Sequence, residues 1–498
     1  MNKLFIGWSE ADITPVTNKK IGLYGQYYVR LAEKIHSRLK VTAAAFSSGN
    51  DHFLTAGLDN VGMPYAFYES VCKRVAELEK EIDTTKIFLH AIHTHSAPSI
   101  NPEAGPLGSD PILHCKESLR EEDRKIPYED MLTPAEYSAF ACEKVAQALV
   151  EAWRNRKEGG IARAFGNARI GHCRRAVYSD NTAEMYGDTT RKDFIGMEAG
   201  EDSGVDMLFT FDKEGKKTGL ILNVACPSQD MESTYQVSSD FAGATREKLQ
   251  KEFGSDFRMI YEISPAGCQS PRDLVRHYAT EPDFWHADGV EELSNRLLHT
   301  VTKAEIGKID YEPAFESKQV TVSLPRRRVS YPDYLKAKAE LARLLAIQPE
   351  KEAFIAFCDE THANEKKDGH GPYDDKKHHF SLIKIEKAVL VRYENQDASP
   401  VITFPMNVIR MGEIAIATNP FELYLYYGQI IKARSKAKQT FLVQLCNGAS
   451  FHAGYLPSPA GERFGGYGGL VVNGQVGSDG GYKLCDDTVA EINKMFGE

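Results

Sequence analysis

Apolar runs of strand length alternate with segments of helical periodicity along most of the chain. The helical spacing of apolar positions occurs in the segments 65–80, 134–154, 242–253, 290–304, 334–346 and 422–433. Strands and helices that alternate along a chain are typical of α/β and mixed α+β proteins. We therefore predict a large mixed β-sheet core that is flanked by helices.

Six of the apolar runs end in polar residues that are able to do chemistry. These runs cover residues 53–58, 87–92, 220–225, 259–263, 413–418 and 441–445. The residues that follow them include Asp59, His93, Cys226, Ser270, Glu422 and Asn447. In open α/β sheets, ligands bind beyond the carboxyl ends of the strands. Ordinary polar turns account for one or two of these cases, and the whole set favours an active site at the strand ends.

His93 and His95 follow the second of these runs. Side chains alternate between the two faces of an extended strand, so both imidazoles are predicted to point to the same side. Two adjacent imidazoles suit a metal ligand with an acid/base neighbour. The alternative is a half-exposed strand with polar residues at its end, since His-x-His pairs are common.

Glu422 stands two residues after Pro420, where a helical pattern is expected to begin. A carboxylate in the first turn of a helix is favoured by the positive end of the helix dipole and stays ionised. An ionised carboxylate suits a metal ion. A first-turn glutamate with a purely electrostatic role is the alternative interpretation.

The composition and the net charge favour an ordinary globular protein over a nucleic-acid-binding or membrane protein. Of the 498 residues, 42% are hydrophobic and 26% are charged, as in ordinary globular proteins. The formal net charge of −10 argues against a nucleic-acid-binding protein, which usually carries a basic patch, and against a strongly anionic membrane surface. No apolar run approaches the length of about 18 residues that a transmembrane helix needs. We expect no nucleic-acid partner and no integral membrane insertion.

The N-terminal residues and the cysteines indicate the cellular compartment in which the protein is expected to occur. Residues 1–12 contain no apolar stretch of signal-peptide length, and Glu10 and Asp12 occur early. The nine cysteines are scattered and form no C-x-x-C pair, which is typical of free thiols in a reducing environment. We therefore expect a cytoplasmic protein with a small-molecule substrate. The pattern leaves the oligomeric state open.

No Pro-, Ser- or Thr-rich break divides the chain, so we predict a single catalytic domain over residues 1–498. Two stretches have the composition of surface insertions. Residues 103–130 are charged and irregular, and residues 359–379 are rich in Lys, Asp, Gly and His. The second stretch contains His370, His378 and His379, for which metal binding is one interpretation and a solvated loop the simpler one.

Two motifs resemble those of the neutral/alkaline ceramidase family. Residues 7–15 read G-W-S-E-A-D-I-T-P and residues 93–98 read H-T-H-S-A-P, where the family typically has A-D-I-T-P and H-T-H-S-G-P-G-G. The resemblance continues, with motifs in the family's order, to about residue 490. It implies the fold of the family's catalytic domain without its C-terminal immunoglobulin-like domain, in a divergent cytoplasmic member. It also implies a zinc-dependent amidase, because that family hydrolyses the N-acyl bond of ceramide.

By this resemblance, one Zn²⁺ ion is held by His93, Cys226, Glu422 and Tyr455. Cys226 is a departure from the family, whose H-P-T motif reads C-P-S at residues 226–228. A thiolate is a good zinc ligand, so zinc binding survives the exchange. The alternative is that Cys226 is a buried thiol and the site is inert.

The resemblance also suggests roles for four residues around the metal. His95 corresponds to an acid/base residue, and an imidazole titrates near neutral pH. Tyr467 and Arg174 correspond to residues that stabilise a developing oxyanion or position the substrate. Ser270 corresponds to the serine of the family's G-D-x-S-P motif. It is expected to contact the substrate, since no G-x-S-x-G nucleophile motif surrounds it.

Three functions remain open at this point. The leading hypothesis is a zinc-dependent hydrolase in which metal-activated water cleaves an amide or N-acyl bond of a soluble substrate. The second is a hydrolase of a sugar or glycoside derivative. It rests on Ser99, Ile100 and Cys268, which replace family residues on the substrate side, and on the aromatic, glycine-rich segment 464–469. The third is a non-catalytic binding protein, suggested by the changes at Cys226 and Cys268.

Overall fold

The computed structural model describes residues 2–26, 28–108, 115–276, 284–368, 378–448 and 453–497, without the side chains of residues 364–368. Eight strands form a large sheet, and they are β1 (Leu4–Asp12), β5 (Lys40–Ser48), β6 (Asp51–Leu58), β7 (Ile87–Ala91), β8 (Lys157–Asn167), β13 (Gly204–Asp212), β14 (Lys217–Val224) and β16 (Arg258–Ile263). Their order is β16-β14-β13-β8-β1-β5-β6-β7. Neighbours are antiparallel except for the parallel pairs β14/β16 and β6/β7. The predicted mixed sheet is confirmed.

A second sheet of four strands lies against the first, which the apolar pattern did not predict. It contains β18 (Phe315–Pro325), β19 (Val401–Met411), β20 (Ile414–Thr418) and β22 (Gln439–Val443), in that order. Alternate residues of both sheets face the layer between them. Phe46, Phe88 and Ile260 of the large sheet share one buried cluster with Ile416 and Phe441 of the small sheet. The core therefore has two sheets back to back.

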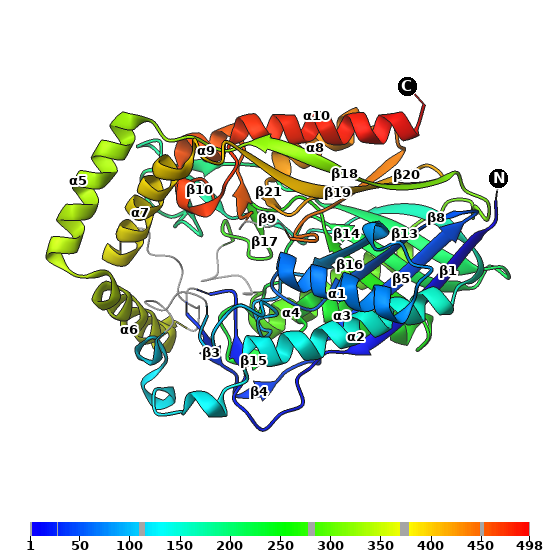
Figure 1. Ribbon diagram of the computed structural model, residues 1–498, viewed down its shortest axis with the longest axis horizontal. Coiled ribbons are helices and arrows are strands. Elements are labelled where there is room, and N and C mark those ends of the chain that lie inside the picture. Colours follow the sequence, from blue (N-terminus) through cyan, green and yellow to red (C-terminus); the bar gives the residue numbers. More distant parts are fainter. Residues whose placement is uncertain are drawn as a thin grey trace.

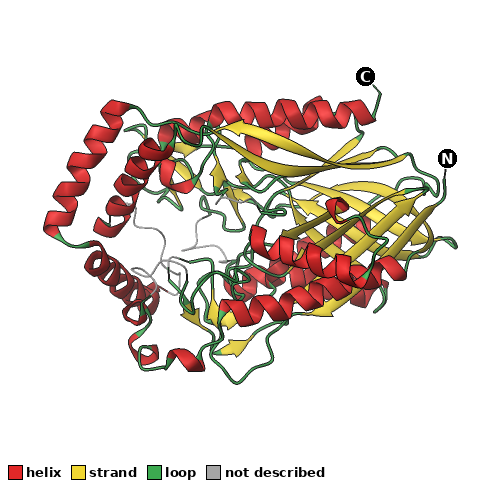
Figure 2. Ribbon diagram, viewed as in Figure 1, coloured by secondary structure: helices red, strands yellow, loops and turns green. Residues whose placement is uncertain are grey.

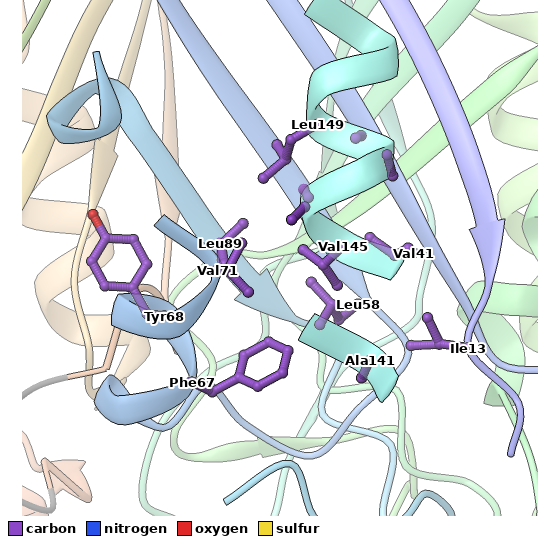
Figure 3. Close-up of a cluster of buried hydrophobic side chains, with 14 of the residues drawn as sticks. Ile13, Val41, Leu58, Phe67, Tyr68, Val71, Leu89, Ala141, Val145 and Leu149 are labelled. Carbon is purple, nitrogen blue, oxygen red and sulfur yellow. The ribbon is translucent and has the colours of Figure 1, made fainter. Parts of the chain in front are cut away.

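Helices cover the outer faces of both sheets (Figures 1 and 2). Their bounds are α1 (Tyr65–Leu78), α2 (Pro134–Arg154), α3 (Asp240–Phe253), α4 (His286–Lys303), α8 (Leu425–Arg434), α9 (Pro459–Phe464) and α10 (Ser478–Met495). Figure 3 shows the packing of α1 and α2, where Phe67, Val71 and Val145 meet Leu58 and Leu89 of the large sheet. Helices α3 and α4 cover the β16 end of the same face, and α8 and α10 cover the small sheet.

The start of α2 shows why the sequence predicted this helix well. The Thr133 hydroxyl accepts from the backbone N–H of Glu136, and the Glu136 carboxylate accepts in return from the backbone N–H of Thr133. Pro134 occupies the first turn, where it costs no hydrogen bond. This reciprocal cap contributes about 1 kcal/mol and defines the first residue of the helix.

Three further helices, α5 (Tyr331–Ile347), α6 (Glu350–Asp368) and α7 (His379–Asn395), form an arm beside the two sheets, on the left of Figure 1. The predicted insertion 359–379 falls on α6 and on the segment before α7. His378 accepts from the backbone N–H of Phe380 as the cap of α7, and His379 Nε2 is 3.0 Å from Leu344 O. His370 lies outside the described residues. The described part of the insertion 103–130 contains three short 3₁₀ helices, Lys116–Ser118, Glu121–Asp123 and Tyr128–Asp130.

Short strands complete the described structure. They are β2 (Gly22–Leu23), β3 (Arg30–Leu31), β4 (Lys34–Ile35), β9 (His172–Cys173), β10 (Arg175–Tyr178), β11 (Ala183–Met185), β12 (Phe194–Met197), β15 (Gln236–Val237), β17 (Gln269–Ser270), β21 (Glu422–Leu423) and β23 (Tyr455–Leu456). Several of these pairs, β9/β17 and β21/β23 among them, position residues of the candidate site. Among the described residues, no helix is both long enough and apolar enough to cross a membrane.

Candidate active site

The carboxyl ends of the central strands lie together, and backbone hydrogen bonds join the segments that leave them. Ser228 N, after β14, donates to Ile92 O, after β7, at 2.9 Å. Cys446 N, after β22, donates to Asn419 O, after β20, at 3.0 Å. Asn447 N, also after β22, donates to Leu89 O of β7 at 2.8 Å and so links the two pairs. The predicted convergence is therefore confirmed for these four strand ends.

His93 lies beyond the end of β7 and has a positive φ of 67°, which is uncommon for a residue other than glycine. Its Nδ1 is 2.5 Å from Val61 O and donates to it, so Nε2 is the nitrogen left for other partners. This Nε2 is 3.2 Å from His95 Nε2 and 3.8 Å from Glu422 Oε2. The two imidazoles are adjacent as predicted. The cause is the irregular backbone after Ala91, where β7 ends and His93 has its positive φ, and not the alternation of side chains along a strand.

Burial decides the protonation of both imidazoles. It lowers the pKa of His93 below the usual range, and the Glu422 carboxylate opposes that shift. It lowers the pKa of His95 further, and the nearby His93 and Arg30 lower it again. Both rings are therefore neutral near pH 7, with one nitrogen as donor and the other as acceptor.

Glu422 and Tyr455 lie side by side on the paired short strands β21 and β23. The prediction that Glu422 begins a helix is wrong, because α8 starts only at Leu425. Backbone pairing with the chain around Tyr455 keeps Glu422 extended. Gly267 approaches this strand so closely that a Cβ there would lie 2.4 Å from Glu422 O, which explains the glycine. The Glu422 carboxylate is thus placed by a strand pair and not by a helix dipole.

Arg174 is the cation beside this pair. Its side chain is almost fully buried, and Nη2 is 3.2 Å from Tyr455 OH and 3.8 Å from Glu422 Oε2. Nη2 also donates to Gly267 O at 3.1 Å. Burial raises the pKa of Tyr455 well above its usual range, and Glu422 adds to that effect whereas Arg174 opposes it. The guanidinium therefore presents a fixed positive charge to two of the predicted metal ligands.

Tyr467 contacts Tyr455, and Ser270 is linked to Arg174 by hydrogen bonds. The Tyr467 ring packs edge-on against the Tyr455 ring, with centroids 5.5 Å apart. Ser270, on β17, is fully buried, and its Oγ accepts from Tyr186 OH at 3.1 Å. Arg174 Nη1 donates to the same Tyr186 hydroxyl at 3.3 Å. Arg174 and Ser270 are thus joined through a tyrosine that the sequence did not indicate.

Tyr186 and Glu232 are the two residues that sequence reasoning missed. Tyr186 has a positive φ of 53°, a backbone conformation that a tyrosine adopts only when its surroundings hold it there. Glu232 is almost fully buried, and its Oε2 is 3.5 Å from His95 Nδ1. Neither residue belongs to a recognisable motif. The one available signal for Glu232 was its place in the polar segment that follows β14.

Cys226 has contacts of a different kind. Its fully buried Sγ is 3.4 Å from Pro227 O and 3.5 Å from Ile170 O, and it belongs to an apolar cluster under α3. Burial raises the pKa of its thiol well above the usual range. Among the residues that the structure describes, no group of three or more His, Cys, Asp and Glu side chains is arranged to hold a metal ion. Metal ligation by Cys226 stays a prediction.

A cavity of about 760 Å³ opens beside His93 and Glu422. It runs along the start of α1 and the segment after the two histidines. Its lining combines apolar, polar and acidic side chains, among them Met63, Tyr65, Glu69, Ser99, Asn101 and Glu103. Ser99 and Ile100, the residues expected to remodel the substrate side, both line it. The cavity is large enough for a small molecule.

Comparison with known proteins shows the fold. No family model and none of the curated proteins matches this sequence. Among solved structures, neutral ceramidase from Pseudomonas aeruginosa superposes with a TM-score of 0.64 over 99% of this chain and 75% of that chain, at 15% identity. A ceramidase complexed with C2 superposes with a TM-score of 0.62 over 98% and 74% of the two chains, at 14% identity. The neutral ceramidase fold implied by the motifs is confirmed.

Proposed function

We propose that this chain is a metal-dependent hydrolase that cleaves an amide or N-acyl bond of a small-molecule substrate. One observation carries the proposal: His93, Glu422 and Tyr455 meet at the converged strand ends, with His95 next to His93. The two structural neighbours are ceramidases by description, which supports an amide bond as the one that is cleaved.

The donor chemistry of these residues fits a zinc ion. His93 uses Nδ1 on Val61 O and keeps Nε2 for another partner, and Glu422 and Tyr455 add oxygen atoms on adjacent strands. Catalytic zinc sites typically have three protein ligands and one open position. We propose that His93, Glu422 and Tyr455 hold one Zn²⁺ and that Cys226 is dispensable. Bound zinc lowers the pKa of a water molecule toward neutrality and polarises a carbonyl group.

We propose that Arg174 and His95 act in the reaction itself and that two other residues position the substrate. The Arg174 guanidinium is held by Gly267 O and Tyr455 OH, and we propose that its positive charge stabilises the developing oxyanion. His95 Nε2 lies 3.2 Å from His93 Nε2, and its Nδ1 lies 3.5 Å from Glu232 Oε2. We propose that His95 exchanges a proton with the substrate. We propose that Tyr467 and Ser270 position the substrate, one through Tyr455 and the other through Tyr186.

The cavity supports a small, polar and soluble substrate. Glu69 and Glu103 are exposed, and the lining around them is partly polar. Carboxylates at this place disfavour anionic substrates by charge repulsion. All nine cysteines are free thiols, which supports the proposal of a reducing, cytoplasmic setting.

Metal analysis and an activity panel test the proposal together. We expect the purified protein to contain one equivalent of zinc, or to take up one, and to hydrolyse N-acyl amides with short acyl groups. The variant His93→Ala is expected to lose both properties. His299→Ala is the matched control, since His299 is exposed on α4.

A preparation that binds no zinc and gains no activity when zinc is added contradicts the metal-dependent function. Turnover of glycosides without turnover of N-acyl amides contradicts the choice of bond. Equal turnover by the parent and by His93→Ala favours a binding protein in place of an enzyme.

A further inference from the structure

Tyr467 belongs to a glycine-rich loop, residues 465–469, that follows the short helix α9. We call this segment the Tyr467 loop. Gly465, Gly466 and Gly468 have φ values of 64°, 71° and 85°, a backbone conformation that glycine adopts at little steric cost. Glycine loses more conformational freedom on folding than any other residue, so a loop of this composition needs contacts that keep it ordered.

Arg175 makes such contacts with the backbone of the Tyr467 loop. Its Nη1 donates to Tyr467 O, and its Nη2 donates to Gly465 O at 2.5 Å and to Gly461 O, in α9, at 3.5 Å. Its Nε donates to Glu198 Oε2 at 2.5 Å. The side chains of Arg175 and Glu198 are both almost fully buried. Each nitrogen of the guanidinium thus has a partner, and two of the partners are carbonyl groups of the loop.

Arg174 and Arg175 are consecutive residues that contact two different tyrosines of the site. Arg174 Nη2 lies 3.2 Å from Tyr455 OH, whereas Arg175 Nη1 donates to the backbone of Tyr467. The Tyr455 and Tyr467 rings pack against each other. Strand β10, which begins at Arg175, pairs with β11 on one side and with β12 on the other, so its backbone is fixed. The same stretch of backbone therefore places Arg174 and, through Arg175, the Tyr467 loop.

We propose that Arg175, paired with Glu198, is a positioning residue that keeps the Tyr467 loop in the conformation in which Tyr467 meets the substrate. Arginine suits this role because its planar guanidinium donates to several oxygen atoms in a fixed geometry, which the ammonium group of lysine does not do. Glu198 balances a charge that would otherwise be buried alone. The effect on catalysis rests on the proposed function of Tyr467, whereas the order of the loop does not.

A contribution to overall stability alone is the competing interpretation. In that case Arg175 and Glu198 form a buried ion pair whose loss weakens the whole fold, and the Tyr467 loop is ordered without them. The two interpretations differ in which backbone amides become accessible and in whether a change at Arg175 acts through Tyr467.

The first measurement is hydrogen–deuterium exchange in the full-length protein. The backbone N–H groups of Gly468, Gly469 and Leu470 donate to Asn473 Oδ1 or to Gly466 O, so their exchange reports opening of the loop. In Arg175→Lys we expect these amides to exchange about 10-fold faster, the factor for the loss of about one hydrogen bond, with the two sheets unchanged.

Two further variants complete this measurement. The double variant Arg175→Met with Glu198→Leu replaces the ion pair by apolar side chains, an exchange that buried pairs commonly tolerate, and it is expected to show the same faster exchange in the loop. The matched control is Arg410→Met, which removes an arginine bonded to the carbonyl groups of Gly412 and Met495. It is expected to leave the Tyr467 loop as in the parent.

The second measurement is a double-mutant cycle of Arg175→Lys with Tyr467→Ala in the zinc-loaded protein. We expect Arg175→Lys to lower kcat/KM about 10- to 100-fold, mainly through KM and with zinc content unchanged, because a displaced Tyr467 positions the substrate poorly. In the Tyr467→Ala background the same change is expected to have almost no further effect. Equal effects in both backgrounds overturn the positioning role, since independent changes add.

The remaining outcomes separate this inference from the proposed function. Loop amides that exchange at the parental rate in a folded Arg175→Lys overturn the inference, whether or not the protein has amidase activity. Faster exchange confined to the loop of a protein without amidase activity contradicts the proposed function and supports the positioning of the loop. If neither Arg175→Lys nor the double variant folds, the stability interpretation holds and the inference is overturned.

Discussion

Two groups of buried histidine and glutamate side chains differ in how they are connected. In the layer between the sheets, His90 and Glu262 are fully buried, and neither nitrogen of His90 hydrogen-bonds to any residue in the described part of the chain. Burial lowers the pKa of His90 to about 3 and raises the pKa of Glu262 to about 8, so both are neutral near pH 7. At the strand ends, His93 and His95 lie within 4 Å of each other and of two carboxylates.

The two groups contain the same types of residue. What distinguishes the candidate site from the polar core is that its histidine and glutamate side chains lie in contact with one another. An isolated ionisable group in an apolar layer becomes neutral and has no neighbouring group with which to exchange a proton. At the strand ends, His93 donates from Nδ1 to Val61 O, and its Nε2 lies within hydrogen-bond distance of His95 Nε2. Only three positions separate His90 from His93, and the irregular segment after β7 carries the chain from one environment to the other.

The largest expected effect is a loss of zinc and of activity, and it is expected only for a variant in the strand-end group. His93→Ala removes a nitrogen ligand, so we expect the loss of zinc and of hydrolytic activity to the uncatalysed level. His90→Leu, a change in the sheet layer, is expected to keep zinc and most of the activity. Inductively coupled plasma mass spectrometry with an N-acyl amide assay measures both. If the two variants behave alike, the comparison fails.

The next effect concerns the second histidine of the strand-end group. His95→Gln is expected to lower kcat by about 10²–10⁴-fold, the usual contribution of a general acid or base, with zinc content unchanged. A loss of zinc equal to that of His93→Ala contradicts the separate roles of the two histidines and assigns both to the metal.

A smaller effect is expected in the pH dependence of stability. The pKa of Glu262 is raised from an ordinary 4.5 to about 8 in the folded protein, so the folded state binds a proton that the unfolded state releases between these values. This stabilisation is complete below about pH 4.5 and is lost as the pH rises toward 8, at up to about 1.4 kcal/mol per pH unit. Glu262→Gln removes the titration, so its unfolding free energy in urea is expected to be flatter over this range than that of the parent. Parallel curves contradict the neutral core carboxyl.

The smallest effect is expected for the stability of the His90 variant. Both ring nitrogens are buried without hydrogen-bond partners among the described residues, so an apolar side chain of similar size removes a cost of about 1–3 kcal/mol. His90→Leu is therefore expected to be as stable as the parent or more stable by about 1 kcal/mol, since the shape of leucine offsets part of the gain. A loss of more than about 2 kcal/mol in urea unfolding indicates a buried partner, such as water, that bonds to His90.

The fold was largely predictable because local signals agreed with it. The apolar runs that end at His93, Cys226 and Glu422 are strands whose ends converge, and the cap at Thr133 marks the first residue of α2. The helix expected at Glu422 is absent because pairing with Tyr455, distant in sequence, outweighs the local helical pattern. Propensity is a weak signal wherever such tertiary pairing competes with it.

The candidate site was predictable only where a motif recorded it. The His-Thr-His motif and the residues around Glu422 and Tyr455 led to three side chains that lie together. Tyr186 and Glu232 have no motif, and they belong to the site through contacts with Arg174 and with His95 that only the folded chain creates. For Cys226, the alignment predicts a ligand, whereas the structure shows contacts with two backbone carbonyls.

Anomalous scattering from crystals of the zinc-loaded protein, recorded on both sides of the zinc absorption edge, tests the central claim most directly. We predict one peak bounded by His93 Nε2, a Glu422 carboxylate oxygen and Tyr455 OH. No peak at this place after saturation with zinc, or a peak at Cys226 that leaves His93 and Glu422 without metal, contradicts the account.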